Sequence, residues 1–326
     1  MVLISVIVPI YKVENFIGRC VDSLMKQSLR QGVEYIFVDD CSPDKSMLVL
    51  NEVLNSYPER KSNILIIKHK ENKGLPSARN TGMQYASGKY IYHCDSDDYL
   101  EDNALELLLQ QAESLHADIV WCDWFLTFSK NERYMKQPVY FTPDEALKGI
   151  LKGHMKYNVW NKLVLHSLYT ENGVLFPDGH GMGEDMTMIR LFACASKIAY
   201  LPTALYHYVK TNNEAYTTSF SQKALSDIQW NVTKTIDFLL YKKGESILCE
   251  INCFKLNVKY PFLISDRRDM YELWQTWFPE SNSYIFRNNG SVRSRLLQYA
   301  ASKRLFWLIR LHYFLVYRFV YGIIYR

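Results

Sequence analysis

The stretch “LISVIVPI” (3–10) decides the fold class expected of this chain of 326 residues. It is an almost continuous apolar run, which predicts a β-strand covered on both faces, as in the parallel sheets of α/β proteins. The run is short, no basic segment precedes it, and it ends at Pro9. We therefore expect a buried strand rather than a signal peptide.

Strand-like and helix-like patterns alternate after this stretch. Apolar runs typical of strands cover 33–40, 63–69, 89–95 and 118–125, and helical spacing covers 14–28, 44–57, 75–87 and 103–115. This alternation predicts a Rossmann-like α/β fold with a mostly parallel central sheet and flanking helices. The elements become shorter after residue 130, and 221–326 is expected to form a helical C-terminal region.

Three segments lie at the carboxyl ends of predicted strands. They are the segments Pro9–Tyr11, Asp39–Asp40 and Asp95–Asp98. Ligands of doubly wound sheets bind beyond the carboxyl ends of the strands. We therefore expect these segments to converge on one crevice.

The motif “YHCDSDDYLED” (92–102) places several acids at one strand end. If the strand continues through the motif, Asp95 and Asp97 share a face, and two carboxylates there suit Mg²⁺ or Mn²⁺. The alternative is an acid-rich strand end that binds no metal. The acids Asp98, Glu101 and Asp102 are expected to stabilise the first turn of the next helix.

Two further stretches carry candidate functional residues. In “ENKGLPSARNTG” (71–82), Arg79 lies early in a predicted helix, where it either receives a diphosphate or clamps two loops together. In “GHGMGEDMTMIRLF” (179–192), a glycine-rich loop precedes Glu184 and Asp185. These acids either cap a helix or present a general base to an incoming hydroxyl.

The composition is that of a globular protein, since 48% hydrophobic and 22% charged residues exclude a disordered or fibrous chain. The seven cysteines have no zinc-like spacing, which predicts reduced thiols and a cytoplasmic location. No stretch reaches the roughly 18 uncharged apolar residues that a membrane span requires.

The charge is distributed unevenly along the chain. Residues 281–326 contain eight basic and no acidic residues, whereas the remainder carries 30 basic and 34 acidic ones. The tail 292–326 interleaves Arg and Lys with aromatic and aliphatic residues, which is typical of a helix lying at an anionic membrane surface. The alternative is a helix whose apolar side packs on the rest of the protein. No nucleic-acid recognition motif accompanies the charges, and we expect no nucleic acid as partner.

Taken in order, these stretches resemble the family 2 glycosyltransferases of the GT-A fold. The resemblance is carried by “SVIVPIYKVENFI”, “IFVDDCSPD”, “NKGLPSARNTG”, “YIYHCDSDDYL”, “VWNKLV” and “GEDM”. It implies a catalytic domain over 1–220, with a nucleotide-binding half (1–125) and an acceptor half (126–220). The implied reaction is inverting transfer of a sugar from a nucleotide-sugar to a hydroxyl of a saccharide or lipid-linked saccharide.

This resemblance also implies a biological setting: synthesis of a bacterial surface polysaccharide such as capsule, lipopolysaccharide O-antigen or exopolysaccharide. Together with the basic tail, it implies a peripheral location on the cytoplasmic face of the inner membrane.

The resemblance implies roles for individual residues in the donor site. They are Pro9, Tyr11 and Glu14 for the base and ribose, Asp39 for the uracil N3–H of a UDP donor, Arg79 for the diphosphate, Asp95 for the ribose and the metal, and Asp97 for the Mn²⁺ or Mg²⁺ ion. The chain departs from the family pattern twice. Lys12 stands where Asn is usual, and Cys41 stands where Gly is usual.

On the acceptor side, the resemblance implies that Asp185 is the catalytic base and that Glu184 contacts the acceptor. Trp160 and Lys162 in “VWNKL” either line the acceptor site or belong to the core. His207 is either a third metal ligand or diphosphate contact, as in some relatives, or a structural residue.

Two other classes of protein fit the sequence less well. A non-catalytic nucleotide-sugar-binding or membrane-scaffold protein on the same fold would be expected to lack Asp97 or Asp185, and both are present. A Rossmann oxidoreductase requires a GxGxxG motif after the first strand, which the chain does not have.

Overall fold

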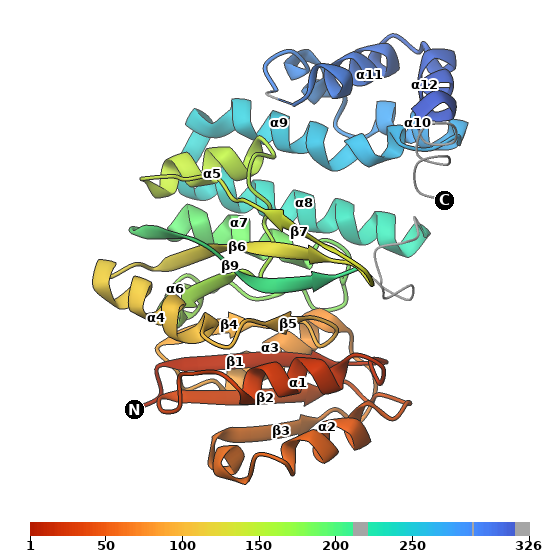
Figure 1. Ribbon diagram of the computed structural model, residues 1–326. Helices are drawn as coiled ribbons and strands as arrows, with labels where there is room; N and C mark the ends of the chain where they lie inside the picture. Colours follow the sequence, from red (N-terminus) through yellow and green to blue (C-terminus); the bar gives the residue numbers. More distant parts are fainter. Residues whose placement is uncertain (211–220, 289, 317–326) are drawn as a thin grey trace. The chain divides into compact units, whose positions relative to one another are not determined.

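The computed structural model describes residues 1–210, 221–288 and 290–316. The chain forms two compact units, one made of residues 1–146 and 157–238 and the other of 147–156 and 239–326 (Figure 1). The sequence-based division into a catalytic domain over 1–220 and a C-terminal region over 221–326 remains a prediction.

The first unit is built on one sheet, in the order β3-β2-β1-β4-β8-β6-β9-β5, with β7 paired to β6. Its strands are β1 Ile4–Ile10, β2 Val33–Asp39, β3 Ile64–Lys68, β4 Tyr90–His93, β5 Tyr99–Leu100, β6 Ile119–Thr127, β7 Glu132–Met135, β8 Lys162–Leu165 and β9 Ile198–Val209. The strands β1 to β4 pair in parallel, and β8 runs antiparallel to both of its neighbours. The predicted Rossmann-like α/β fold with a helical C-terminal region is confirmed.

The register of the parallel strands brings their ends together. Ile10 pairs with Asp39, and Asp39 pairs with Lys68. Since all seven residues of β1 are buried, the apolar run of the sequence forms the centre of this half of the sheet. Segments that follow β1, β2 and β4 therefore share one edge, as expected.

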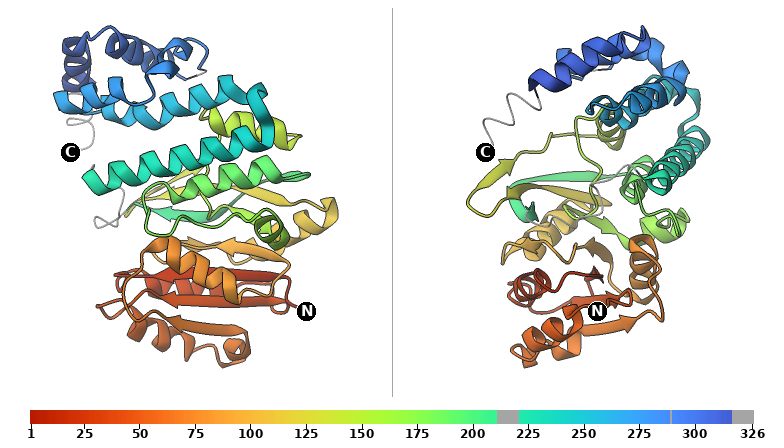
Figure 2. Two further views of the ribbon diagram at one scale, coloured as in Figure 1. Left: turned by 180° about the vertical axis from the view of Figure 1, so that it is seen from behind. Right: turned by 90° about the vertical axis from the view of Figure 1, so that its right-hand side faces the viewer.

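Helices cover both faces of the sheet. The helices that lie wholly in the first unit are α1 Ile17–Met25, α2 Ser46–Leu54, α3 Leu75–Tyr85, α4 Ala104–Leu115, α6 His166–Glu171 and α7 Thr187–Cys194. Two more helices, α5 Pro143–Leu151 and α8 Gln222–Lys243, begin in the first unit and end in the second. Figure 2 shows α1 and α2 on one face, and α3, α7 and α8 on the other. The helix α3 approaches β1 closely, because a Cβ added to Gly82 would lie 2.4 Å from Cγ2 of Ile7.

The motif 92–102 differs from the sequence-based expectation. β4 ends at His93, and residues 95–98 form a turn in which the Asp98 amide donates to the Asp95 carbonyl (3.2 Å). The strand therefore does not continue through the motif, which was the condition for Asp95 and Asp97 to share a face of it. Asp98 is also not a helix-capping residue, because it is 1% exposed and accepts hydrogen bonds from the Tyr206 hydroxyl (2.7 Å) and the Val209 amide (2.7 Å).

The second unit is helical. Its helices are α9 Leu248–Lys259, α10 Arg268–Thr276, α11 Val292–Ser302 and α12 Phe306–Tyr313, with short 3₁₀ turns between them. The ammonium group of Lys259 lies in its core and donates to the carbonyl oxygen of Trp277 (2.9 Å) and to Oδ1 of Asn282 (2.7 Å). These acceptors tie α9 to the 3₁₀ turn Pro279–Tyr284.

The described part of the tail contains two short helices. α11 and α12 are separated at Arg304, which has a left-handed φ of 57°. Within the described residues, no helix is both long enough and apolar enough to cross a bilayer. Residues 317–326 of the predicted tail lie outside the described residues.

Candidate active site

The loops after β1 and β2 form the first part of the site. Pro9 lies within β1, and Tyr11 follows it with 41% of its surface exposed. The carboxylate of Asp39 is almost completely buried and accepts from the Ser42 amide (2.8 Å). Oε2 of Glu14 accepts from the Lys45 amide (2.9 Å), so the loop after β1 is bonded to the loop before α2. The residues predicted to hold a base and ribose thus lie on adjacent loops.

The two departures from the family pattern lie at left-handed backbone positions. The φ angle is 55° at Lys12 and 58° at Cys41. Asn and Gly adopt this region more readily than other residues. The usual residues at these two positions therefore suit this backbone conformation better than Lys12 and Cys41 do.

Asp40 holds a neighbouring loop, a role that the sequence did not reveal. Its carboxylate accepts from the amides of Lys73 and Gly74 (both 2.8 Å) and bonds to Nδ1 of His69 (2.7 Å). Gly74 is the residue before α3 and has a φ of 88°. Asp40 therefore fixes the start of the helix that carries Arg79. The adjacent acids of “VDD” mark Asp40 as a candidate functional residue. They do not reveal this role, because the partners of Asp40 lie 29 or more positions away in the chain.

Arg79 joins the two acidic motifs of the sequence. It is 1% exposed, and its Nη2 donates to Oδ1 of Asp95 (2.8 Å). Its Nη1 donates to Oδ1 of Asp185 (3.2 Å) and lies 3.6 Å from Oε1 of Glu184. One guanidinium group thus faces three carboxylates, so that the arginine clamps two loops. This was one of the two alternatives that the sequence left open.

The electrostatics of the pair Glu184–Asp185 follow from this arrangement. Their side chains are 14% and 28% exposed. Burial and the adjacent Asp185 carboxylate raise the pKa of Glu184 to about 8, against the lowering effect of Arg79. Burial also raises the pKa of Asp185, while the Arg79 guanidinium opposes the rise. A carboxylate with a raised pKa is a stronger proton acceptor than an ordinary one.

Comparison with known proteins identifies the family of this chain. Residues 5–186 match the protein family described as Glycosyl transferase family 2. This chain belongs to glycosyltransferase family 2. The matched residues include the strand-end loops, the turn at Asp95, Arg79 and the pair Glu184–Asp185. The prediction of a glycosyltransferase is confirmed at the level of the family.

Two relatives and one solved structure illustrate the similarity. The uncharacterized glycosyltransferase EpsJ of Bacillus subtilis (strain 168) is 34% identical over 219 residues, which are 65% of this chain and 62% of EpsJ. The poly(ribitol-phosphate) beta-glucosyltransferase of Bacillus spizizenii (strain ATCC 23059 / NRRL B-14472 / W23) is 31% identical over 222 residues, 65% of this chain and 33% of that protein. The match thus spans less than two thirds of either relative.

The fold is similar to that of S. aureus TarS 1-349, whose crystal structure was solved in complex with UDP-GlcNAc. The two structures have a TM-score of 0.69 and 18% sequence identity, and the similarity covers 95% of this chain and 91% of that one. At this identity the similarity establishes the fold.

In this family 2 glycosyltransferase, the two residues of “VWNKL” lie in the interior. Trp160 is 5% exposed and stacks on Tyr206, with ring centroids 4.5 Å apart. Lys162 is 1% exposed, and its Nζ donates to the Asn158 carbonyl (2.6 Å) and Oδ1 of Asn161 (2.8 Å). Burial lowers the pKa of Lys162 to about 7, although the Asp185 carboxylate acts in the opposite direction. Their predicted acceptor contacts remain predictions.

Tyr206 connects the same aromatic cluster to the acidic turn. Its hydroxyl donates to Oδ2 of Asp98 and accepts from the Asp95 amide (3.2 Å). It therefore holds the turn at Asp95 in place from β9. The sequence did not single out Tyr206, because a tyrosine in an aromatic strand has no local signal for a contact that lies 111 positions away.

His207 lies between two aromatic rings and two carboxylates. Its ring stacks on Tyr99 at 4.1 Å and on Phe125 at 4.8 Å. Its Nδ1 lies 2.8 Å from Oε1 of Glu132, and its Nε2 lies 2.7 Å from Oε1 of Glu101. Glu101 therefore bonds to a histidine in addition to preceding α4. Coordination of a metal by His207 remains a prediction, and it would require one of these bonds to open.

The acidic turn fits a metal ion whose coordination shell is completed by oxygen atoms of a bound ligand. In the described part of the chain, no group of three or more His, Cys, Asp or Glu side chains is arranged to hold a metal ion. Asp95 and Asp97 are nevertheless partly exposed at the turn. Burial, together with the negative charges of Asp97 and Asp95, raises the pKa of Asp98 well above its ordinary value. A magnesium site commonly uses only one or two protein carboxylates, with phosphate oxygens completing the shell.

Proposed function

We propose that this protein transfers a sugar from a UDP-sugar to a hydroxyl group of a saccharide acceptor, with inversion at the anomeric carbon and with Asp185 as the base. One observation carries the proposal: Arg79 bonds both Asp95, at the turn beyond the donor-site strands, and Asp185. In a direct displacement the base and the leaving diphosphate must lie on opposite sides of the sugar. A single rigid side chain that spans both motifs suits this requirement.

The proposed step is a single displacement. An acceptor oxygen attacks the anomeric carbon, the bond from that carbon to the diphosphate oxygen breaks, and the acceptor proton passes to the carboxylate of Asp185. The products are the glycoside and UDP. The raised pKa of Asp185 supports its role as proton acceptor. Glu184, which lies beside it, is proposed to contact the acceptor.

The donor is assigned from the strand-end loops. Asp39, buried at the end of β2, is proposed to accept from the uracil N3–H, with Pro9, Tyr11 and Glu14 around the base and ribose. The complex of TarS with UDP-GlcNAc supports a UDP-sugar donor for this fold.

Asp97, together with Asp95, is proposed to hold the divalent cation. When bound, Mn²⁺ or Mg²⁺ would supply charge compensation for the leaving diphosphate.

Metal dependence of UDP binding tests the donor site. Wild-type protein is expected to bind UDP in the presence of Mn²⁺, and less tightly in EDTA, when measured by calorimetric titration. Asp97→Ala is expected to reduce the affinity in Mn²⁺ to the value in EDTA, because the cation can no longer link protein to diphosphate. GDP, CMP and NAD serve as competing nucleotides. Tight binding of GDP would overturn the choice of donor, and equal affinity of the variant and the wild type would place the metal elsewhere.

A surface polysaccharide is the proposed product. The poly(ribitol-phosphate) beta-glucosyltransferase relative supports an acceptor that is a cell-surface polymer or its lipid-linked precursor. A lipid-linked acceptor would be presented at the membrane, and the C-terminal helices carry the residues suited to bind there.

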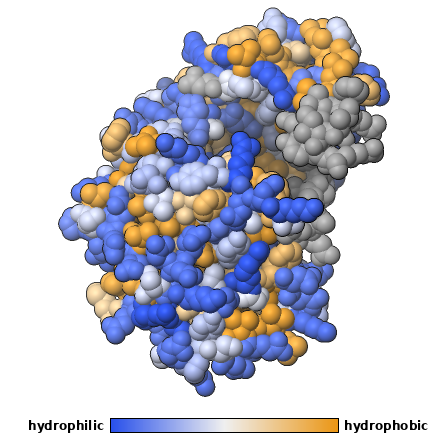
Figure 3. All heavy atoms as spheres, viewed as in Figure 1, coloured by the Kyte–Doolittle hydropathy of each residue, from blue (hydrophilic) through white to orange (hydrophobic). Residues whose placement is uncertain are grey.

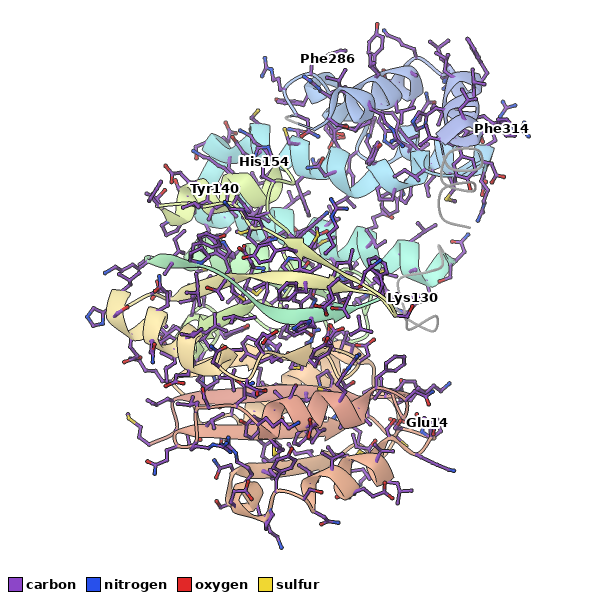
Figure 4. All side chains as sticks on the ribbon, in the orientation of Figure 1. Glu14, Lys130, Tyr140, His154, Phe286 and Phe314 are labelled. Carbon is purple, nitrogen blue, oxygen red and sulfur yellow. The ribbon has the colours of Figure 1, made fainter. Side chains whose placement is uncertain are left out.

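These helices expose apolar residues on single faces. On α11 the exposed apolar residues are Val292, Leu296 and Tyr299, and on α12 they are Trp307 and Leu311, with Phe314 and Leu315 directly after its last residue. The spacings are those of one helical face. Figure 3 shows hydrophobic residues gathered over this region, and Figure 4 labels the exposed Phe286 and Phe314 there.

The charge of this region supports an anionic lipid surface as the partner. Lys303, Arg304 and Arg310 are exposed beside the apolar residues, and 281–326 contains no Asp or Glu. Basic residues gain on the order of 1 kcal/mol each near such a surface, and apolar side chains gain more by leaving water. We therefore infer a peripheral location on the cytoplasmic face of the inner membrane.

Vesicle sedimentation tests this location. Wild-type protein is expected to sediment with phosphatidylglycerol vesicles, and less with phosphatidylcholine vesicles. The double variant Trp307→Glu/Leu311→Glu is expected to lose most of the bound fraction, because it places two negative charges on the apolar face. Tyr241→Glu is the control, since Tyr241 is 84% exposed but lies on α8. Unchanged binding of the double variant would rule out this face.

A further inference from the structure

The loop before the proposed base has neighbours on two helices. Residues 177–183, which we call the base loop, lead directly into Glu184 and Asp185. The loop contains Gly179 and Gly183 with φ angles of 76° and 90°. Because both glycines have a positive φ, the base loop does not continue as a helix or strand. Its conformation therefore depends on contacts with neighbouring elements.

The helix α3 fixes the beginning of the base loop. Oδ1 of Asn80 accepts from the Phe176 amide (2.9 Å), and its Nδ2 donates to the Phe176 carbonyl (2.9 Å) and to Oδ1 of Asp178 (3.0 Å). The Ser77 hydroxyl donates to the same oxygen of Asp178 (2.9 Å). Together with Arg79, these residues bind the loop at its first residues and at the acids that follow it.

The helix α8 holds the middle of the base loop. Nζ of Lys223 donates to the Gly179 carbonyl (2.6 Å) and to Oδ1 of Asp227 (2.6 Å). His180 lies with its Nδ1 3.2 Å from the same Asp227 oxygen, and its ring stacks on Trp230 at 4.2 Å and 10°. The loop is therefore bonded to α8 through both its backbone and its side chains.

Asn231 bonds two carbonyls of the loop. It is 3% exposed, and its Nδ2 donates to the His180 carbonyl (3.1 Å) and to the Met182 carbonyl (3.0 Å). Both hydrogens of the amide group are thus used on the two sides of Gly181. The contact residues of α8 are Lys223, Asp227, Trp230 and Asn231, which are spaced as one helical face. All four of these residues contact the base loop.

We propose that Asn231 is a positioning residue for glycosyl transfer, which holds the base loop so that Asp185 faces the acceptor oxygen. The proposal rests on the function proposed above. Arg79 attracts Glu184 and Asp185 by charge, but it does not determine the path of the loop before them. The two hydrogen bonds from Asn231 do, because they fix the carbonyls two and four residues before Glu184. A shift of about 1 Å in a catalytic group costs on the order of a hundredfold in rate.

Asn231→Asp tests the proposal with an isosteric side chain. The carboxylate cannot donate to the two carbonyls and repels them. We expect kcat for UDP release from the UDP-sugar that the wild type turns over to fall about 10- to 100-fold. The KM for that UDP-sugar and the Kd for UDP are expected to stay unchanged, since the donor loops follow β1, β2 and β4. Thr233→Ala, at an exposed position of the same helix, is the control.

A second variant tests the proposal in case Asn231→Asp fails to fold. Lys223 is 61% exposed at its side chain, and Lys223→Met removes its bonds to the Gly179 carbonyl and to Asp227, which keeps His180 as a partner. It is expected to lower kcat in the same direction by a smaller factor, and Lys223→Arg is expected to restore it. Thermal unfolding of each variant is measured alongside.

The outcomes separate this proposal from the proposed function. If Asp185→Asn is inactive while Asn231→Asp and Lys223→Met keep the kcat of the wild type, the positioning role of α8 is wrong and the base assignment stands. A rise in KM with unchanged kcat would also contradict the positioning role. Turnover by Asp185→Asn at the rate of the wild type would overturn both.

Discussion

Asp185→Asn is expected to lower kcat about 1000-fold, because a positioned general base contributes on the order of 10² to 10⁴ to the rate. The amide has nearly the shape of the carboxylate and still accepts a hydrogen bond from Arg79, so the site is expected to keep its geometry. The affinity for UDP in the presence of Mn²⁺ is expected to stay unchanged, since in the proposed mechanism the nucleotide lies on the side of the sugar opposite Asp185. Steady-state UDP release measures kcat, and calorimetric titration measures the Kd for UDP.

Asp237→Asn is the matched control for this experiment. It makes the same chemical change at an exposed position of α8 and is expected to leave kcat unchanged. Turnover by Asp185→Asn within a few-fold of the wild type would remove Asp185 from the role of base. Loss of UDP binding in the same variant would indicate a collapse of the site instead of a missing proton acceptor.

Arg79→Met is expected to have the second large effect. The substitution leaves Asp95, Glu184 and Asp185 without the buried cation that they share. Loss of one partner from a buried ion pair costs about 3–5 kcal/mol of stability, which should be visible as a lower midpoint of thermal unfolding. The rate is expected to fall as well, because the turn at Asp95 and the base are no longer joined.

The pH dependence distinguishes this effect from simple loss of stability. Arg79 lowers the pKa values of Glu184 and Asp185, against the effect of burial. Its removal should therefore raise both pKa values, so that the base loses its proton only at a higher pH. The acidic limb of the profile of kcat/KM against pH is expected to move upward in Arg79→Met and to move less in Arg79→Lys, which keeps the charge.

Arg60→Met provides the comparison for a buried arginine outside the site. Arg60 is 2% exposed and donates to the carbonyls of Met25, Gln27, Leu29 and Arg30. Its loss is expected to lower stability without moving the acidic limb. The same limb position in Arg79→Met and the wild type would contradict the proposed electrostatic role of Arg79.

Much of the fold was predictable, because it depends on local periodicity. The apolar run of β1 and the alternation of strands and helices were enough for the α/β class, and the boundaries of β1, β2 and α3 lie close to the predicted ones. The turn at Asp95 was not predicted. A strand pattern followed by acids has no local signal for the point where pairing ends, which here depends on the bonds from Asp98 to β9.

The motifs of the site were visible in the sequence, but their connections were not. Asp95 and Asp185 each belong to a recognisable motif, and Arg79 lies 106 positions before Asp185. The positions of Trp160 and Lys162 were equally open, since a tryptophan or a lysine next to a motif suits a binding surface or a core. The structure places both in the interior, where stacking on Tyr206 and bonds to Asn158 and Asn161 occupy them.

The sequence by itself therefore determined the α/β class, the acidic strand ends, the family and the basic C-terminal region, because these depend on residue types and short spacings. Only the tertiary structure decided that Arg79 joins the two acidic motifs, that Tyr206 and Asp98 hold the turn, and that one face of α8 holds the base loop. These contacts form between segments far apart in the chain, and their distances follow from the packing of the sheet and helices, which no local pattern of residues records.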